Sequence, residues 1–311
     1  MNYKHLFGPV FSRRLGLSLG IDLTPYKVCN LNCVYCESGK TTTHISERKE
    51  YIPFDEIISE LDEYLSSSPA LNYLTFSGAG EPTLNSRLGD IIDYLKTKYS
   101  HYKIALITNS VLFQNPLVRL EVLKVDLVLP SLDSVTEDVF KKINRPCKDI
   151  KIEQVIEGLI EFRKIYKGQI WLEIFLIPGI NDTDNELKRM KEKLFLINPD
   201  IIQLNTLDRP GTEKWVEQTD PLKLEKIKDY FQPLKTEIIS SNYRQYNITR
   251  IKTENRFSII STLKRRPCTA DELSAIIKSD TKETIVLLDE LIKERKIICS
   301  NQNNRIYYTV L

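Results

Sequence analysis

Val28-Cys29-Asn30-Leu31-Asn32-Cys33-Val34-Tyr35-Cys36 is the stretch on which the interpretation of this chain depends. Three of the six cysteines lie in it, with the spacing C-x3-C-x2-C. Three thiolates this close can bind three irons of an iron–sulfur cluster, whose protein ligands are cysteine thiolates. The fourth iron then lacks a protein ligand, and an open position of this kind is where a catalytic metal site binds substrate or cofactor.

The spacing alone leaves a buried core stripe and a zinc site open for these cysteines. Positions i, i+4 and i+7 share one helical face, and cysteine is often a small buried hydrophobe, so a core stripe would also fit. A zinc site ordinarily takes a fourth Cys or His, and His44 is the candidate close in sequence. Asn30 and Asn32, with Pro25 before and Gly39 after, favour a loop over a long helix.

The composition is ordinary for a globular protein, with 41% hydrophobic and 28% charged residues, and 311 residues suffice for a large and a small domain. A net charge of +2 gives no strong nucleic-acid or membrane signal. The sequence has no signal segment and no apolar run of 18 residues, so we expect a cytoplasmic protein without membrane contact. In that reducing compartment, cysteines favour metal binding or catalysis over disulfides. Cys147, Cys268 and Cys299 are scattered, and we expect them to be buried or incidental thiols.

Strand-like and helix-like segments alternate along most of the chain. This alternation predicts an α/β fold with a parallel sheet and right-handed crossovers. The expected strands are 17–23, 71–76, 103–107, 125–133, 169–177 and 200–207. The expected helices are 54–67, 86–99, 115–123, 151–166 and 184–197.

Candidate binding residues follow the expected strands, where ligands bind in parallel α/β folds. They are Gly78, Ala79, Gly80, Glu81 and Pro82 after the second strand, Thr108 and Asn109 after the third, Ser131 and Asp133 in the fourth, and Asn205, Asp208 and Arg209 in and after the sixth. Glycines at a strand end permit close approach of the backbone to a ligand, although a tight turn would also use them.

Two of these strand-end assignments have structural alternatives, and so do two arginines before the first strand. Asp133 would also serve as the cap of the following helix, and Asp208 with Arg209 would also hold a loop as an ion pair. Arg13 and Arg14 precede the first strand and would bind an anionic group or lie solvated in a turn.

The pattern C-x3-C-x-aromatic-C resembles the cluster motif of the radical S-adenosylmethionine (SAM) enzymes. The resemblance implies that Cys29, Cys33 and Cys36 bind a 4Fe–4S cluster and that Tyr35 lies against the adenine of SAM. In that family the amino and carboxylate groups of SAM chelate the unligated iron. One electron from the cluster cleaves SAM to methionine and a 5′-deoxyadenosyl radical, which abstracts hydrogen from the substrate.

Other segments resemble the same family in the expected order. The turn Gly78-Ala79-Gly80-Glu81-Pro82 resembles its Gly-Gly-Glu segment, which binds the SAM amino group, with Ala79 where a second glycine often stands. Thr108-Asn109-Ser110 resembles its Thr-Asn-Gly segment near SAM, and Ser131 and Asp133 resemble its ribose- or carboxylate-contacting positions. Asn205 would face SAM or the substrate, and Asp208 and Arg209 the substrate. The resemblance covers about residues 8–240 and implies a partial (β/α)6 barrel within residues 1–250.

Residues 251–311 look like a small winged helix-turn-helix domain. Helices are expected at 255–264, 270–278 (with Thr269 as N-cap) and 281–295, followed by a hairpin over 296–310. With 11 Lys and Arg against 8 Asp and Glu in residues 252–311, the charge does not select a nucleic-acid surface. Nucleic-acid contact through residues 281–284, protein or peptide contact, and packing on the barrel all stay open.

We therefore expect a radical SAM enzyme with one 4Fe–4S cluster, served by a one-electron donor of the flavodoxin or ferredoxin type. Residues 8–16 and 78–84 look most like a group allied to the wyosine-type tRNA-modifying synthases. Those synthases carry a second cluster on earlier cysteines, and no cysteine precedes Cys29 here. A tRNA base, a peptide and a small metabolite remain candidate substrates, and no catalytic residue beyond the cluster is assigned. The alternative from another class is an Fe–S-sensing winged-helix transcription regulator.

Overall fold

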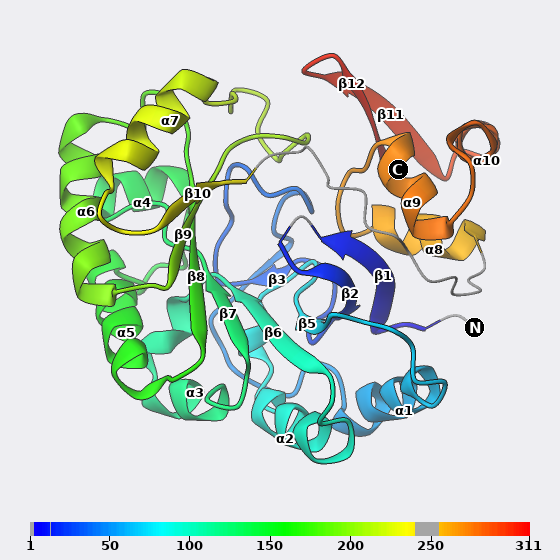
Figure 1. The fold of residues 1–311 in the computed structure, drawn as a ribbon, viewed down its shortest axis with the longest axis horizontal. Coiled ribbons are helices and arrows are strands. Elements are labelled where there is room, and N and C mark those ends of the chain that lie inside the picture. Colours follow the sequence, from blue (N-terminus) through cyan, green and yellow to red (C-terminus); the bar gives the residue numbers. More distant parts are fainter. Residues whose placement is uncertain (1–2, 13, 240–254) are drawn as a thin grey trace.

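One curved sheet lies at the centre of the computed structural model, which describes residues 3–12, 14–239 and 255–311 (Figure 1). Within these residues eight strands form the sheet, in the order β1-β2-β5-β6-β7-β8-β9-β10. β1 pairs antiparallel with β2, and the other neighbouring pairs are parallel. The strands are β1 (Leu6–Ser12), β2 (Gly16–Ile21), β5 (Tyr73–Phe76), β6 (Lys103–Thr108), β7 (Leu127–Pro130), β8 (Gln169–Phe175), β9 (Ile201–Asn205) and β10 (Thr236–Ile238).

The predicted α/β class with a mostly parallel sheet is confirmed, and β2, β5, β6, β7, β8 and β9 lie at the six predicted positions. The sequence did not predict the outer strands β1 and β10. β1 contains Gly8-Pro9, and its register with β2 shifts between Phe7 and Val10, so it lacks a regular alternation. β10 has three residues, too few to show any periodicity.

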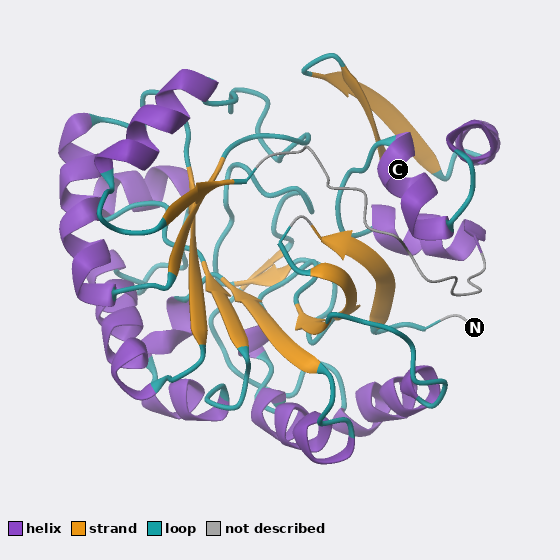
Figure 2. Cartoon of the chain, viewed as in Figure 1, coloured by secondary structure: helices purple, strands orange, loops and turns teal. Residues whose placement is uncertain are grey.

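Helices surround the outside of the sheet (Figure 2). They are α1 (Phe54–Leu65), α2 (Leu88–Lys98), α3 (Pro116–Glu121), α4 (Glu137–Ile143), α5 (Ile152–Ile165), α6 (Asp184–Ile197) and α7 (Pro221–Tyr230). In α1, the buried residues Ile57, Ile58, Leu61 and Leu65 form one face, as the helical spacing predicted. No helix in the described ranges combines the length and the hydrophobicity needed to cross a bilayer.

The main core lies between the sheet and these helices. All four residues of β7 are buried, because a parallel strand is covered on both faces. Strand residues such as Leu106 and Val128 belong to the same buried cluster as the helix residues Ile91 and Leu159. This core fixes the strands, so that the loops at their carboxyl ends start from rigid positions.

Residues 255–311, here called the C-terminal unit, contain α8 (Asn255–Leu263), α9 (Ala270–Ile277), α10 (Thr281–Lys293), β11 (Ile297–Gln302) and β12 (Arg305–Val310). These elements lie where the sequence predicted three helices and a hairpin. Thr269 caps α9 and forms a capping box with Glu272. The predicted boundary at residues 250 and 251 lies outside the described residues, and the winged helix-turn-helix assignment stays a prediction.

The C-terminal unit has its own core and packs against β1. Ile259, Leu273 and Leu288 are among its buried residues, and Val10 of β1 packs against them. Thr284, one of the four residues considered for nucleic-acid contact, is fully buried, and its hydroxyl donates to Asp280 O at 3.0 Å.

Gly158 of α5 tests how tightly helix and loop pack. A Cβ at this position would lie 2.6 Å from both Phe113 C and Gln114 N, in the 3-10 turn η2 (Val111–Gln114). Backbone cannot rotate away, so we expect Gly158→Ala to lower the free energy of unfolding by about 2 kcal/mol, as overpacking does. Urea denaturation monitored by circular dichroism measures this change.

Gly89→Ala in α2 is the matched control. Its Cβ would meet mainly the side chain of Glu121, at 2.9 Å from Cγ, and side chains shift more easily than backbone. We expect a smaller loss than at Gly158, because the Glu121 side chain can move aside whereas the backbone of residues 113 and 114 cannot. Equal losses at the two positions would contradict this account of α5 packing.

Candidate functional site

The cysteine loop, residues 29–44, follows β2 and is closed by a short parallel pairing of β3 (Val28–Cys29) with β4 (Thr43–His44). The amide of Val34 donates to the carbonyl of Ile143 at 2.9 Å, which holds the middle of the loop against another segment. Residues 29–39 form turns rather than a helix, so the alternative of a helical core stripe is wrong. The three cysteines are instead held on a loop with fixed backbone positions.

Burial disfavours negative charge on two of the three sulfurs. It raises the pKa of Cys29 to about 12, and the nearby carboxylate of Glu81 adds to the shift. It raises the pKa of Cys33 well above its usual range, with a further contribution from Asp133. Because metals bind the thiolate, a cation at this site would have to compensate the buried charge.

Nitrogen donors approach all three sulfurs, as expected where thiolates carry negative charge. Hydrogen bonds to sulfur orient metal ligands and tune iron–sulfur clusters. The side-chain donors are Asn109 Nδ2 to Cys29 Sγ at 3.6 Å, Asn144 Nδ2 to Cys33 Sγ at 3.5 Å, and Lys27 Nζ to Cys36 Sγ at 3.1 Å.

The donor set and its surroundings fit an iron–sulfur cluster. Asn30 is fully buried beside Cys29, and its Nδ2 has no partner in the described structure. A sulfide of a bound cluster would be an acceptor for this nitrogen. Among the described residues, no three His, Cys, Asp or Glu side chains converge as ligands of one metal ion. A cubane needs no such convergence, because each thiolate binds its own iron. His44, the candidate fourth zinc ligand, places its Nε2 3.2 Å from the carbonyl oxygen of Asn30.

Tyr35 and Asp133 bind each other. The Tyr35 hydroxyl donates to Asp133 Oδ2 at 2.5 Å, and its ring stacks on Phe175 with 3.9 Å between centroids. Asp133 also accepts from Asn144 Nδ2 at 2.6 Å and from the Phe175 amide at 2.9 Å, and burial raises its pKa to about 6. The helix-cap alternative for Asp133 is wrong, because Thr136 is the N-cap of α4. Asp133 thus orients Asn144, which donates to Cys33.

The glycine turn, residues 78–82, follows β5 and packs directly on the cysteine loop. A Cβ at Gly80 would lie 2.4 Å from the carbonyl oxygen of Val28, so only glycine allows this approach. The Glu81 amide donates to the same carbonyl at 3.1 Å. Ala79 is buried, and the chain passes through a φ of +135° at Gly78. The turn and the cysteine loop are therefore one packed unit.

The Glu81 carboxylate joins this turn to the next strand end. It accepts hydrogen bonds from the Thr83 amide and hydroxyl, the Thr108 hydroxyl and the Asn109 amide, at 2.5 to 3.1 Å. These donors match the acceptor capacity of a carboxylate, so Glu81 fixes the turn relative to β6. Contact between Glu81 and the SAM ammonium group stays a prediction, as does a role for Pro82.

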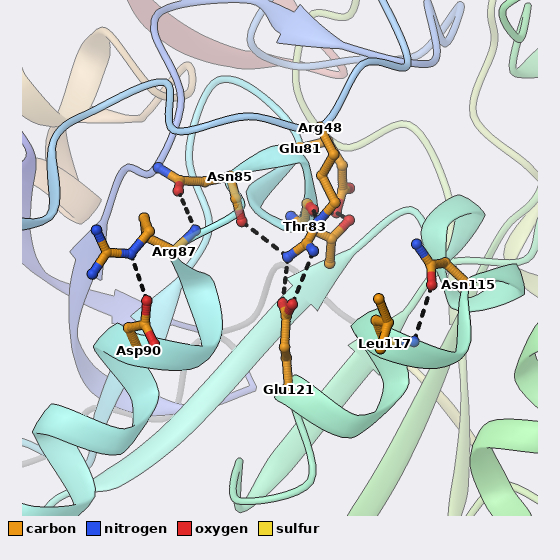
Figure 3. A network of polar contacts seen from close by, with 9 residues as sticks. All are labelled: Arg48, Glu81, Thr83, Asn85, Arg87, Asp90, Asn115, Leu117 and Glu121. Atoms are coloured by element: carbon orange, nitrogen blue, oxygen red, sulfur yellow. Dashed lines mark hydrogen bonds and ion pairs between the residues drawn. The ribbon is translucent and has the colours of Figure 1, made fainter.

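Arg48 supports the segment that follows the turn (Figure 3). Its Nε donates to the carbonyl of Thr83 at 2.8 Å, and its Nη2 donates to that of Asn85 at 3.2 Å. An ion pair with Glu121, the last residue of the neighbouring helix α3, holds the guanidinium in place. Arg48 thereby connects the residues after the glycine turn to a helix on the outside of the sheet.

The remaining predicted residues lie at other strand ends. Ser131 accepts a hydrogen bond from Ser110 Oγ at 3.0 Å, beside the Thr108 strand end. Asn205 Nδ2 donates to Glu173 Oε1 at 3.4 Å, and the same Glu173 forms an ion pair with Arg14. The side chain of Glu173 in β8 therefore contacts both Asn205 in β9 and Arg14 in the segment before β2.

Arg209 is buried between two carboxylates. It forms ion pairs with Glu37 at 3.4 Å and with Glu272 of α9 at 2.5 Å. Arg209 thus holds a loop through its ion pairs with Glu37 and Glu272. Substrate contact by Asp208 and Arg209 stays a prediction, and Arg13 lies outside the described residues.

Sequence reasoning missed three residues of the site. Lys27 and Asn144 contact cysteine sulfurs, and Asp22 lies against the glycine turn. The polar break at residues 143–147 was a signal for Asn144. Lys27 is buried with a positive φ of 57°, and neither property can be read from the sequence. Asp22 follows β2 as an ordinary polar residue, and its role depends on a partner far along the chain.

Two cavities border the cysteine loop. The larger, of about 930 Å³, is lined by Asp22, Thr24, Glu37, Ala79 and Arg265, among others, and lies within the range of small-molecule sites. The smaller, of about 40 Å³, is lined by Cys33, Tyr35 and Asn109, among others. Only the larger cavity has room for a small molecule, because the smaller one is about the size of a single water molecule.

Comparison with known proteins gives consistent matches. The profile of the Radical SAM superfamily matches residues 23–190. UPF0026 protein MJ1312 of Methanocaldococcus jannaschii is 33% identical over 313 residues, covering 97% of this chain and 94% of that protein. A Brachyspira hyodysenteriae protein named GTPase Obg is 36% identical over 310 residues, which cover 99% of this chain but 45% of that protein.

A solved structure shows the same fold. The crystal structure of a radical SAM methyltransferase from Sphaerobacter thermophilus superposes with a TM-score of 0.57 and 15% sequence identity. The match covers 71% of this chain and 65% of that one. The profile match extends over the cysteine loop, the glycine turn and the following strand ends. This chain is therefore a member of the radical SAM superfamily and, through its near full-length relative, of the UPF0026 proteins.

Proposed function

We propose that this chain is a radical SAM enzyme that binds one 4Fe–4S cluster through Cys29, Cys33 and Cys36. The observation that carries this proposal is the nitrogen donor at each of the three sulfurs. Neutral thiols in a core do not require such donors, whereas cluster thiolates do. The unpaired Nδ2 of Asn30 adds a further donor at the same place.

Cys29, Cys33 and Cys36 would hold the cluster, which would supply the single electron needed for reductive cleavage of SAM and hydrogen abstraction from a substrate. The chain's own residues hold and orient the reactants. The main chain of residues 78–80 offers close backbone approach to the SAM amino group, and Glu81 fixes that backbone. From the family resemblance we assign Tyr35 to the adenine, Ser131 and Asp133 to the ribose or carboxylate of SAM, and Asn205 to SAM or the substrate. Asn109 serves the cluster through Cys29.

The substrate site we propose lies at the strand ends beside Glu173, which contacts Asn205 of β9 and Arg14 before β2. The cavity of about 930 Å³ has room for a small molecule, but its lining includes none of the three cysteines and none of Tyr35, Ser131, Asp133 and Asn205. The alliance with wyosine-type synthases, the modification of a tRNA base and the modification of a peptide remain alternatives within the same chemistry. A flavodoxin- or ferredoxin-type donor is the partner we propose for reduction.

A reducing cytoplasm is the compartment we propose, because none of the six cysteines forms a disulfide. The Fe–S-sensing transcription regulator remains the alternative from another class. It would bind nucleic acid through the C-terminal unit and would have no use for SAM cleavage. SAM cleavage by the reduced protein therefore separates the two functions.

Anaerobic reconstitution tests the ligand set. The wild-type protein should bind about four irons per chain, show the electron paramagnetic resonance signal of a reduced cubane, and release 5′-deoxyadenosine from SAM after reduction. Cys29→Ala, Cys33→Ala and Cys36→Ala should each abolish that release, because each removes a cluster ligand. Cys299→Ala is the control, since Cys299 is exposed on the hairpin. If one of the three cysteine variants kept wild-type iron content and turnover, that cysteine would not be a cluster ligand. Tetrahedral zinc in the wild type would refute the proposal.

Gly78→Ala tests whether the glycine turn binds SAM. A Cβ at Gly78 would lie 1.6 Å from Asp22 Oδ1, so the turn has to move. We expect the dissociation constant of SAM, measured by equilibrium dialysis, to rise at least about tenfold, equivalent to about 1.4 kcal/mol.

Gly179→Ala is the matched control. Gly179 also has a positive φ, of 72°, but a Cβ there meets nothing within 4 Å. Gly179→Ala should lose about 1–2 kcal/mol of stability from backbone strain, and Gly78→Ala should lose more, because its φ of +135° lies outside the left-handed helical region and its Cβ also meets Asp22. Only Gly78→Ala should weaken SAM binding. Unchanged SAM affinity in Gly78→Ala would remove the turn from the binding site.

A further inference from the structure

A buried ion pair connects the C-terminal unit to the end of β2. Arg265, two residues beyond α8, pairs with Asp22, and both side chains are largely buried, with 14% and 10% exposed. The guanidinium also lies 4.8 Å from the centre of the Phe7 ring. Ser38 Oγ, in the cysteine loop, donates to the carbonyl of Arg265 at 2.7 Å. Arg265 is therefore held by β1, by the end of β2 and by the cysteine loop.

The other side of Asp22 faces the glycine turn. Burial raises the pKa of its carboxyl group, whereas the backbone amide of Ala79 lies near this carboxylate and favours its charged form. Gly78 lies so close that a Cβ would overlap Asp22 Oδ1, at 1.6 Å. Asp22 thus lies between Arg265 on one side and residues 78–79 on the other. A displacement of this carboxylate would displace the turn.

The same interface has a second ionic connection. Arg209 pairs with Glu272 of α9 and with Glu37, which directly follows Cys36. Glu272 also closes the capping box of α9, so its carboxylate is fixed within the C-terminal unit. One connection thus ends on the glycine turn and the other on the cysteine loop. Both belong to the cofactor site of the proposed enzyme.

We propose that Arg265 is a positioning residue for SAM binding: from the C-terminal unit, it holds the Asp22 carboxylate against the amide of Ala79 and so fixes the glycine turn. This inference rests on the proposed function. It assigns the C-terminal unit to the cofactor site, independently of any nucleic-acid contact. A carboxylate buried without its cation would draw in water or move, and the turn would lose its fixed conformation.

Arg265→Met tests the proposal, because methionine keeps a similar length without the charge. In the apo-protein, the amides of residues 77–81 should exchange with deuterium at least about tenfold faster than in wild type, since local opening becomes easier. In the reconstituted protein, the SAM dissociation constant should rise at least about tenfold, while iron content stays at the wild-type level. Arg265→Lys, which retains the charge, should recover most of the affinity.

Arg256→Met is the matched control. Arg256 lies in the same unit, but its ion pairs with Glu290 and Glu294 stay within that unit. It should leave both measurements at wild-type values. The double variant Asp22→Asn with Arg265→Met should bind SAM more tightly than Arg265→Met alone, because it removes the unpaired charge and keeps an acceptor for Ala79.

The outcomes separate this inference from the proposed function. Unchanged exchange at 77–81, or unchanged SAM affinity, in Arg265→Met overturns it. Equal losses in Arg256→Met also overturn it, since they indicate general destabilisation. If Arg265→Met fails to fold, the affinity of Arg265→Lys and of the double variant decides. A wild-type protein that binds a cluster but no SAM would refute the proposed function, whereas the exchange of the apo-protein would still report whether Arg265 holds the turn.

Discussion

The site depends on compensating negative charge at three neighbouring sulfurs inside a protein. Burial alone opposes that charge, as the raised pKa values of Cys29 and Cys33 indicate. Two of the three compensating side chains come from distant parts of the sequence, since Asn109 follows β6 and Asn144 follows α4, whereas Lys27 lies just before the motif. A nine-residue cysteine motif therefore cannot make the site by itself. It needs a sheet that brings successive strand ends to one edge, which the parallel α/β fold provides.

Two carboxylates join the strand ends, and the hydrogen bonds that they accept come from the protein itself. Glu81 binds Thr83, Thr108 and Asn109, and Asp133 binds Tyr35, Asn144 and Phe175. Each carboxylate thereby connects a loop near the cysteines to the end of another strand. The result is a preorganised site, in which side chains keep their positions before any ligand arrives. Glycine is required where two such segments touch, as Gly80 does at Val28.

The sequence predicted those features that are local. The six central strands and the N-cap Thr269 follow from short patterns of residues, and the structure has them. The outer strand β1 was missed because Gly8-Pro9 interrupts its alternation. The residues that contact the cysteine sulfurs were predicted only in part: Asn109 stood in a recognised segment, whereas Lys27 carried no signal. A helix cap was the local alternative for Asp133, but its hydrogen bonds come from Tyr35, Asn144 and Phe175, which lie in other segments.

The ion pairs at the C-terminal unit fix the positions of the groups that they join more than they stabilise the interface. Removing two charges from water offsets most of their attraction, so an apolar contact of the same size would stabilise the interface as well. The interface already has such contacts, since Val10 packs into the C-terminal core. Charged pairs differ from apolar contacts in fixing the orientation of the groups that they join. Arg265 and Arg209 place that constraint beside the glycine turn and the cysteine loop, where small displacements would matter most for binding a cofactor.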